Sequence, residues 1–242
     1  MALPNSSLRR LLAPLRRTPL HPQWLVFRDE PRVRHWVRER AHGRVLDIGA
    51  ADGWARRVIS SDCTYVGLDY AVTATEMYHT SPDVFADGAQ LPFSDESFDT
   101  VLLLEVLEHV ARPADVLCEI RRVLGPDGTL LLSMPFLYPL HDAPHDYQRY
   151  TSPGLTFALA QAGLLTIEPM PRNRGFEAAA LLCAIASADA IISALETRRW
   201  RLLFAPLLLL AIPVANIAGW LLSPLSGSNM LATGHAVEAH RS

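Results

Sequence analysis

The nine residues VLDIGAADG, from Val45 to Gly53, restrict the fold of this chain more than any other stretch. A short run of mostly apolar residues has the length of a buried strand, and it leads directly into a turn of glycine and alanine. A strand that ends in such a turn and continues into a helix is typical of an open parallel sheet. Ligands of these sheets bind beyond the carboxyl ends of the strands, so the turn predicts a ligand site as well as a fold.

The alternation of strands and helices continues along the chain. We predict strands at 45–48, 65–68, 84–86, 100–104, 129–134 and 165–168. We predict helices near 54–61, 71–78, 114–124 and 153–162, and another at 32–40, before the first strand. Alternation at this spacing predicts an α/β fold, a parallel sheet with helices on both faces.

The distribution of charge along the chain limits the classes of ligand that the turn can bind. All 22 lysine-plus-arginine residues are arginine, which favours a GC-rich and therefore bacterial source, and the stretch from Asp62 to Glu108 holds ten acids and neither lysine nor arginine. Acidic walls repel polyanions and suit a positively charged ligand, so we expect neither nucleic acid nor a dinucleotide. The turn also lacks the G-x-G-x-x-G pattern of nicotinamide oxidoreductases. Three widely spaced cysteines favour a reduced, cytoplasmic protein.

Several stretches in the same order resemble the class I S-adenosylmethionine-dependent methyltransferases. VLDIGAADG resembles their D-x-G-x-G-x-G turn with Ala51 at the middle glycine, and YVGLDY resembles their second strand. FADGAQLPFSDESFDTVLLLEVLEHV is similar to the adenine-binding turn and fourth strand, and EIRRVLGPDGTLLLSMP to the following helix and fifth strand. The resemblance covers 44–170. It implies a Rossmann-like, doubly wound, mostly parallel seven-stranded sheet whose antiparallel last strand is ATGHAVEAH, 232–240.

The resemblance also implies the cofactor, S-adenosyl-L-methionine, and the residues that bind it. Asp47 would lie near the ammonium group, Asp69 would accept hydrogen bonds from both ribose hydroxyls, and Asp87 would accept one from the adenine amino group. The other expected cofactor-binding residues are Gly49, Ala51, Gly53, Gly88 and Glu105. The alternative is that the three aspartates only cap turns.

The loop PFLYPLHDAPHDYQRYT follows the fifth strand and contains two His-Asp pairs. It resembles the loop of bacterial methyltransferases linked to surface glycan or lipid biosynthesis, which implies a hydroxyl-bearing glycan, lipid or small-molecule acceptor. A hydroxyl nucleophile needs a base. We expect His145 in that role, with His141 second. In the alternative interpretation the loop is a hydrogen-bonded lid.

A second catalytic hypothesis concerns EVLEH. Glu105, Glu108 and His109 resemble the E-x-x-E-H string of metal-dependent O-methyltransferases, in which a divalent ion holds the acceptor. The preferred interpretation has no metal, and His109 then packs structurally. A competing function from another class is a catalytically silent cofactor-binding protein that lies against a membrane.

The last quarter of the chain is strongly apolar. Residues 202–226 include no charged residue, and 176–195 carry only Glu177 and Asp189. We divide the chain into an Arg-rich arm and helix (1–42), the methyltransferase core (43–171), an apolar helical insertion (172–230) and a closing strand (231–242). Because prolines interrupt 202–226 and the last strand returns to the sheet, we expect peripheral contact of 198–226 and the arm with the inner face of a membrane. The alternatives are that 202–226 is buried in the protein or crosses the membrane once.

Overall fold

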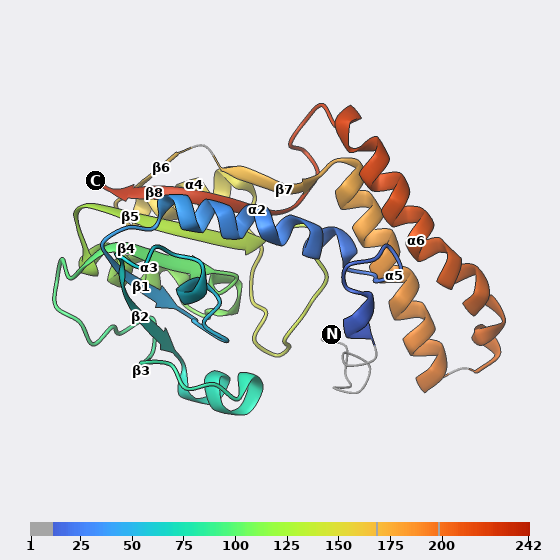
Figure 1. The fold of residues 1–242 in the computed structure, drawn as a ribbon, viewed down its shortest axis with the longest axis horizontal. Helices are drawn as coiled ribbons and strands as arrows, with labels where there is room; N and C mark the ends of the chain where they lie inside the picture. Colours follow the sequence, from blue (N-terminus) through green and yellow to red (C-terminus); the bar gives the residue numbers. More distant parts are fainter. Residues whose placement is uncertain (1–11, 168, 198) are drawn as a thin grey trace. The chain divides into compact units, whose positions relative to one another are not determined.

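A computed structural model describes residues 12–167, 169–197 and 199–242 (Figure 1). The chain divides into two compact units. The core unit consists of Arg32–Phe136, Pro144–Met170 and His235–Ser242. The hairpin unit consists of Met1–Pro31, Leu137–Ala143 and Pro171–Gly234. Residues 1–11 of the predicted arm, Glu168 of the strand predicted at 165–168 and Arg198 of the predicted membrane-contact segment lie outside the described residues.

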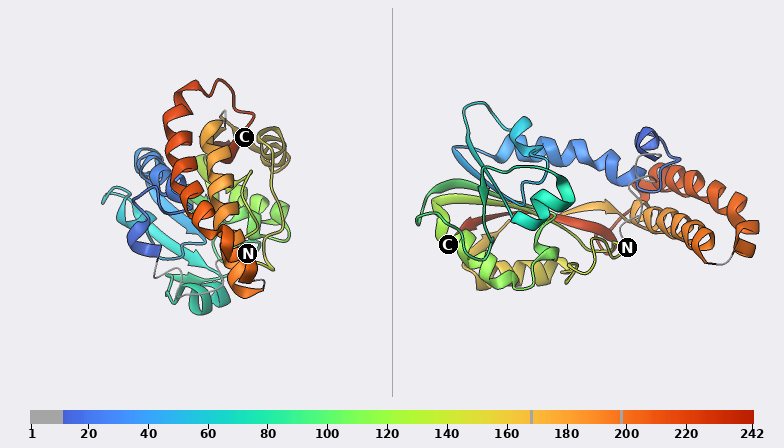
Figure 2. Two further views of the ribbon diagram at one scale, coloured as in Figure 1. Left: turned by 90° about the vertical axis from the view of Figure 1, so that its right-hand side faces the viewer. Right: turned by 90° about the horizontal axis from the view of Figure 1, so that it is seen from below.

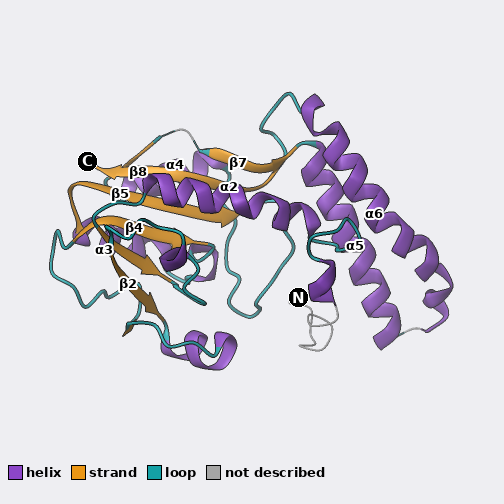
Figure 3. Ribbon diagram, in the orientation of Figure 1, coloured by secondary structure: helices purple, strands orange, loops and turns teal. Residues whose placement is uncertain are grey.

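The core unit contains a mixed sheet in the order β3-β2-β1-β4-β5-β8-β6 (Figure 3). Strand β1 pairs in parallel with β2 and β4, and β8 pairs antiparallel with β6. The strands are β1 Arg44–Ile48, β2 Thr64–Asp69, β3 Val84–Phe85, β4 Phe98–Leu104, β5 Leu124–Pro135, β6 Leu164–Thr166 and β8 Ala232–Arg241. The predicted fold class is therefore confirmed, including the antiparallel last strand.

Side chains alternate between the two faces of this sheet. Leu46 and Ile48 of β1 pack in the larger cluster with α3 (Pro113–Val123) and α4 (Ser152–Gln161). Val45 packs in a second cluster with Val37 of α2 (Trp24–Arg40). The two-residue period of a strand thus gives helices on both faces, and the strand ends remain open to a ligand.

Four local predictions are corrected. The helix expected at 54–61 is only a 3₁₀ turn, Ala55–Arg57. Branched Val58 and Ile59 and the turn-forming Ser-Ser-Asp that follows end it after one turn. The helix at 71–78 becomes a π-helix from Thr73 to Tyr78. Helix α2 begins at Trp24 rather than at residue 32. The fourth correction is an additional strand, β7 (Met170–Arg174), which pairs with β8.

The hairpin unit contains the apolar insertion, which forms two helices. Helices α5 (Phe176–Glu196) and α6 (Ala205–Leu222) lie side by side in every view, joined by the 3₁₀ segment Arg199–Phe204 (Figures 1 and 2). Prolines do not interrupt α6, which contrasts with the expectation above, because Pro206 lies in its first turn and Pro213 is accommodated inside. By length and composition, Phe176–Glu196 and Trp200–Leu225 could each cross a membrane.

Candidate cofactor site

The turn after β1 has a left-handed backbone at three positions, Gly49, Ala51 and Gly53, with φ of +75°, +46° and +64°. A Cβ at Gly49 would lie 2.4 Å from Cγ2 of Val106, so only glycine lets the loop after β4 approach. A Cβ at Gly53 would meet no heavy atom of the described residues within 4 Å. Ala51 adopts this conformation at a cost of about 1 kcal/mol. The turn therefore carries backbone strain at Ala51 and leaves room beside Gly53, and strain of this kind is common at ligand-binding turns.

Asp69, at the end of β2, is buried and joins its strand to this turn. Its Oδ2 accepts a hydrogen bond from Ala51 N at 3.0 Å, and its Oδ1 accepts one from Tyr70 N at 2.7 Å. Burial raises the pKa of Asp69, while these two N–H donors oppose the rise. The carboxylate thus holds the turn in place, as the capping alternative expected. Each carboxylate oxygen has a second lone pair, so Asp69 can hold the turn and still accept hydrogen bonds from the ribose hydroxyls of a cofactor.

Asp47 in β1 is 4% exposed, and its Oδ2 accepts a hydrogen bond from the Tyr65 hydroxyl at 2.5 Å. Burial raises the pKa of Asp47 to about 7, the Tyr65 hydrogen bond opposes the rise, and the neighbouring Asp69 and Asp52 add to it. Asp69 and Asp52 therefore repel the ionised form of Asp47, and Arg56 offsets only part of that repulsion. A cation bound here would relieve that repulsion, so these residues fit a ligand with an ammonium and a sulfonium group.

Asp87 and Gly88 follow β3. Ala86 N donates to Asp69 O at 3.2 Å, which brings this turn beside the end of β2. Asp87 is exposed, and its Oδ1 accepts from Ala89 N at 2.8 Å, so it does shape its own turn. A Cβ at Gly88 would lie 3.3 Å from Cγ2 of Ile48, so the turn packs tightly against β1. Both residues therefore lie at the carboxyl ends of the strands, on the same side of the sheet as the turn after β1.

Glu105 follows β4 and also lies at this edge. It has a φ of +57°, its N–H donates to Ser133 O at 2.8 Å, and its Oε1 accepts from the Ser133 hydroxyl at 2.7 Å. Ser133 lies in β5 opposite Leu104 and was not among the predicted site residues. The only signal for Ser133 in the sequence is a hydroxyl in an otherwise apolar part of its strand.

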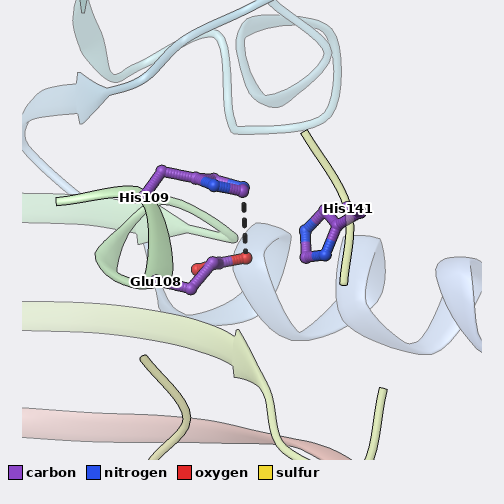
Figure 4. Close-up of side chains that lie close together, drawn as sticks. All are labelled: Glu108, His109 and His141. Carbon is purple, nitrogen blue, oxygen red and sulfur yellow. Dashed lines mark ion pairs between the residues drawn. The ribbon is translucent and has the colours of Figure 1, made fainter. Parts of the chain in front are cut away.

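The 3₁₀ turn Leu107–His109 follows β4 and contacts the second half of the loop 135–151, the predicted acceptor-binding loop. His109 Nδ1 lies 2.7 Å from the backbone oxygen of His145, and Tyr147 N donates to Glu108 O at 2.9 Å. The other ring nitrogen of His109 lies 3.6 Å from Oε1 of Glu108, a fully buried carboxyl group (Figure 4). The backbone around His145 is thereby held beside β4.

The side chains of the loop divide into two kinds. Gln148 donates to the backbone oxygens of Leu107 and Val110, and Arg149 pairs with both oxygens of Asp146, so these groups hold the loop. His145 and Tyr147 are exposed, and Nδ1 of the histidine lies 3.0 Å from the tyrosine hydroxyl.

The second predicted histidine, His141, belongs to the hairpin unit. Within that unit its ring lies edge-on to Tyr138, 5.5 Å between ring centres, and its Nδ1 lies 3.3 Å from the backbone oxygen of Pro139. The two His-Asp pairs are therefore neighbours in sequence but members of different units.

The chain matches a protein family over part of its length. Residues 46–132 match the methyltransferase domain family. An uncharacterized methyltransferase of Mycobacterium tuberculosis is 34% identical over 118 residues, 46% of this chain and 43% of that protein. The human probable tRNA methyltransferase 9B is 33% identical over 108 residues, 42% of this chain and 24% of that protein. The chain thus spans less than half the length of these curated relatives.

Solved structures share the fold. A putative sarcosine dimethylglycine methyltransferase from Galdieria sulphuraria aligns with a TM-score of 0.52 at 16% identity, over 91% of this chain and 85% of that one. The [4+2]-cyclase SpnF aligns with a TM-score of 0.53 at 17% identity, over 87% and 80%. Residues 46–132 of the core unit therefore match a methyltransferase domain, and the sheet has the Rossmann-like fold of these solved structures. Because one neighbour is a cyclase, the reaction has to be argued from the site.

Proposed function

We propose that this chain transfers a methyl group from S-adenosylmethionine to a hydroxyl group of a glycan, lipid-linked or small-molecule acceptor, with His145 as the base. One observation carries the proposal: the backbone of His145, whose imidazole is exposed, is held beside the end of β4, the strand that Glu105 follows. The cofactor, when bound, supplies a methyl group on a positively charged sulfur.

The residues at the strand ends would bind and orient the cofactor. Asp47 provides negative charge for the ammonium group, Asp69 provides acceptors for the ribose, and the turn of Asp87 and Gly88 faces the adenine. Glu105 adds an acceptor at the end of β4. These residues come from four neighbouring strands, and fixing the cofactor in one position is what an in-line transfer needs.

His145 would take the proton of the acceptor hydroxyl. When Nδ1–H of the imidazole donates to the oxygen of Tyr147, 3.0 Å away, Nε2 carries a lone pair and can accept that proton. Tyr147 is then a positioning residue that selects the tautomer. Nε2 would hold the proton that the acceptor hydroxyl loses when its oxygen takes up the methyl group.

Mutagenesis of the loop tests the assignment. His145→Ala should lose about 10²–10⁴-fold in turnover while cofactor affinity is retained, because a base acts on the acceptor. His35→Ala, at an exposed histidine of α2, is the matched control. Reduced cofactor affinity with unchanged turnover would make His145 part of a lid.

The assay uses labelled cofactor with lipid and glycan extracts of the source organism. Mass spectrometry of gene-deleted cells identifies the acceptor as the molecule lacking one methyl group. Cofactor binding without transfer to any extract would favour a catalytically silent binding protein.

A metal-assisted reaction is the second candidate. A metal-ligating histidine usually donates one ring N–H to a carbonyl oxygen, and His109 has this arrangement toward His145 O while its other nitrogen faces Glu108. If chelation abolishes turnover and Mg²⁺ restores it, Glu105, Glu108 and His109 bind the ion and this candidate replaces the first. Turnover that is unchanged by chelator supports the histidine base.

A further inference from the structure

In helix α6 small residues face the partner helix and large apolar residues face outward, which is the reverse of the arrangement in a water-soluble hairpin. Its buried positions are Ile212, Asn216 and Gly219, and a Cβ at Gly219 would lie 2.3 Å from Cβ of Ala180 in α5. Small residues thus let the two helices approach closely while large apolar residues point away. A row of large apolar side chains that points away from the partner helix marks a surface that another apolar phase can cover.

The outward side of α6 carries a continuous apolar stripe. Its five members are spaced by three or four residues, which places them on one helix face, and their exposed fractions run from 41% to 65%. This outer stripe consists of Leu207, Leu210, Val214, Ile217 and Leu221. It is about 21 Å long at the rise of an α-helix. Leu209 and Leu222 widen it into a convex surface, and the exposed Leu203 and Phe204 of the preceding 3₁₀ segment add apolar surface at its start.

The outward side of α5 differs from this stripe. Its exposed positions include the small or charged Ala179, Cys183, Ala186 and Asp189. Its exposed large apolar residues are only Phe176, Leu182 and Leu195, whose spacing places them on different faces of the helix instead of in one stripe. A hairpin that crossed a bilayer would expose both helices to lipid and would bring Asp189 into the hydrocarbon at a cost of a few kcal/mol. The difference between the two helices favours an orientation in which only α6 meets lipid.

Tryptophan–arginine contacts lie near both ends of α6, at Trp200 in the preceding 3₁₀ segment and at Trp220 in the last turn of the helix. The Arg201 guanidinium lies 5.8 Å from the Trp200 ring, and the Arg28 guanidinium lies 4.8 Å from the Trp220 ring. Such side chains prefer the level of lipid headgroups, where the ring is partly apolar and the cation meets phosphate. Arg16, in the arm of the same unit, is also exposed and adds attraction to anionic lipid.

The path of the chain agrees with an attachment from one side. Strand β8 pairs with β6, with Leu164 opposite Arg241, so the segment between these strands leaves the sheet and returns to it. A chain that crossed a bilayer once between β6 and β8 could not form this pairing.

We propose that α6 is a membrane-docking helix that lies in the plane of an anionic lipid surface, with its outer stripe in one leaflet and α5 directed away from the bilayer. A fluid lipid surface can cover a convex apolar ridge along its whole length, whereas a rigid partner would need a matching groove. The proposal is independent of methyl transfer, because it concerns residues of the hairpin unit alone.

Flotation of the full-length protein with vesicles tests the proposal. Binding is expected to vesicles of phosphatidylglycerol and phosphatidylethanolamine and to be weaker with phosphatidylcholine. Leu207→Glu and Leu210→Glu should each reduce partitioning about tenfold or more. Ala186→Glu on α5 is the matched control and should bind as the parent does. Equal loss in all three variants would overturn in-plane docking in favour of a span. A stable dimer that Leu207→Glu dissociates, without vesicle binding, would show a second copy on this surface.

The native thiol of Cys183, exposed on α5, reports the orientation directly. With Cys118→Ser as background, a membrane-impermeant maleimide should label Cys183 in vesicle-bound protein, while the thiol introduced by Leu210→Cys should be protected. Protection of both thiols would indicate a span, and labelling of both would show that α6 does not dock. Peptide mass mapping identifies the labelled thiol, and circular dichroism verifies that each variant folds.

Discussion

Asp47 should make the ligand-free protein less stable as the pH rises, which is unusual for an aspartate. Its pKa is raised from 3.8 to about 7 by burial, so between these values the folded chain holds a proton that the unfolded chain has lost. The free energy of unfolding therefore falls as pH rises through this window. The shift corresponds to about 4 kcal/mol once the pH exceeds 7. Asp47→Asn removes the charge and keeps an oxygen for the Tyr65 hydroxyl.

Urea unfolding at pH 5 and pH 8, followed by circular dichroism, measures this effect. Asp47→Asn should raise stability by several kcal/mol at pH 8 and by much less at pH 5, while weakening the binding of a cationic cofactor. The matched control is Asp99→Asn. Asp99 in β4 has its pKa lowered mainly by its hydrogen bonds from Arg44, so its contribution is present above the unfolded pKa and is lost as pH falls. Asp99→Asn should therefore destabilise at both pH values. If Asp47→Asn also destabilises at pH 8, the reasoning is refuted.

Four other substitutions test the turn, the cofactor residues and the hairpin. Asp69→Ala should weaken cofactor binding, since each charge-assisted hydrogen bond contributes roughly 1.5–3 kcal/mol; calorimetry showing unchanged affinity would remove Asp69 from the site. Gly49→Ala should destabilise the core by about 1–3 kcal/mol because its Cβ meets Val106, whereas Gly53→Ala, facing open space, should cost only about 1 kcal/mol in thermal unfolding. Gly219→Val should separate the packed helices of the hairpin and speed proteolysis there, and cleavage at the parent rate would contradict the packing described.

The fold could be predicted from the sequence because the strands are short, apolar and regularly spaced. Strand β7 escaped prediction because MPRNR is polar and has no alternation, and its pairing with β8 makes it a strand. The helix after Gly53 was overpredicted, because the expected element contains branched residues and turn formers that end it after one turn.

The residues of the candidate site could be predicted where a sequence motif marks the end of a strand. They could not be predicted where packing decides which side chains contact one another. Tyr65 was missed as a partner of Asp47 because their contact depends on Gly67. A Cβ at Gly67 would lie 3.2 Å from Cε1 of Tyr65, so the glycine leaves the space that the ring occupies. The sequence also presents His141 and His145 as one constellation, and the division into two units follows from tertiary contacts that no local pattern contains.

Calorimetric titration of the full chain tests the central claim most directly. We predict saturable binding of S-adenosylmethionine and of its demethylated product, tightening as the pH rises through about 7 because the bound cation favours ionised Asp47. NAD should produce no binding heat. Measurable affinity for NAD, with none for S-adenosylmethionine at any pH between 6 and 8 around that pKa of about 7, would contradict the account.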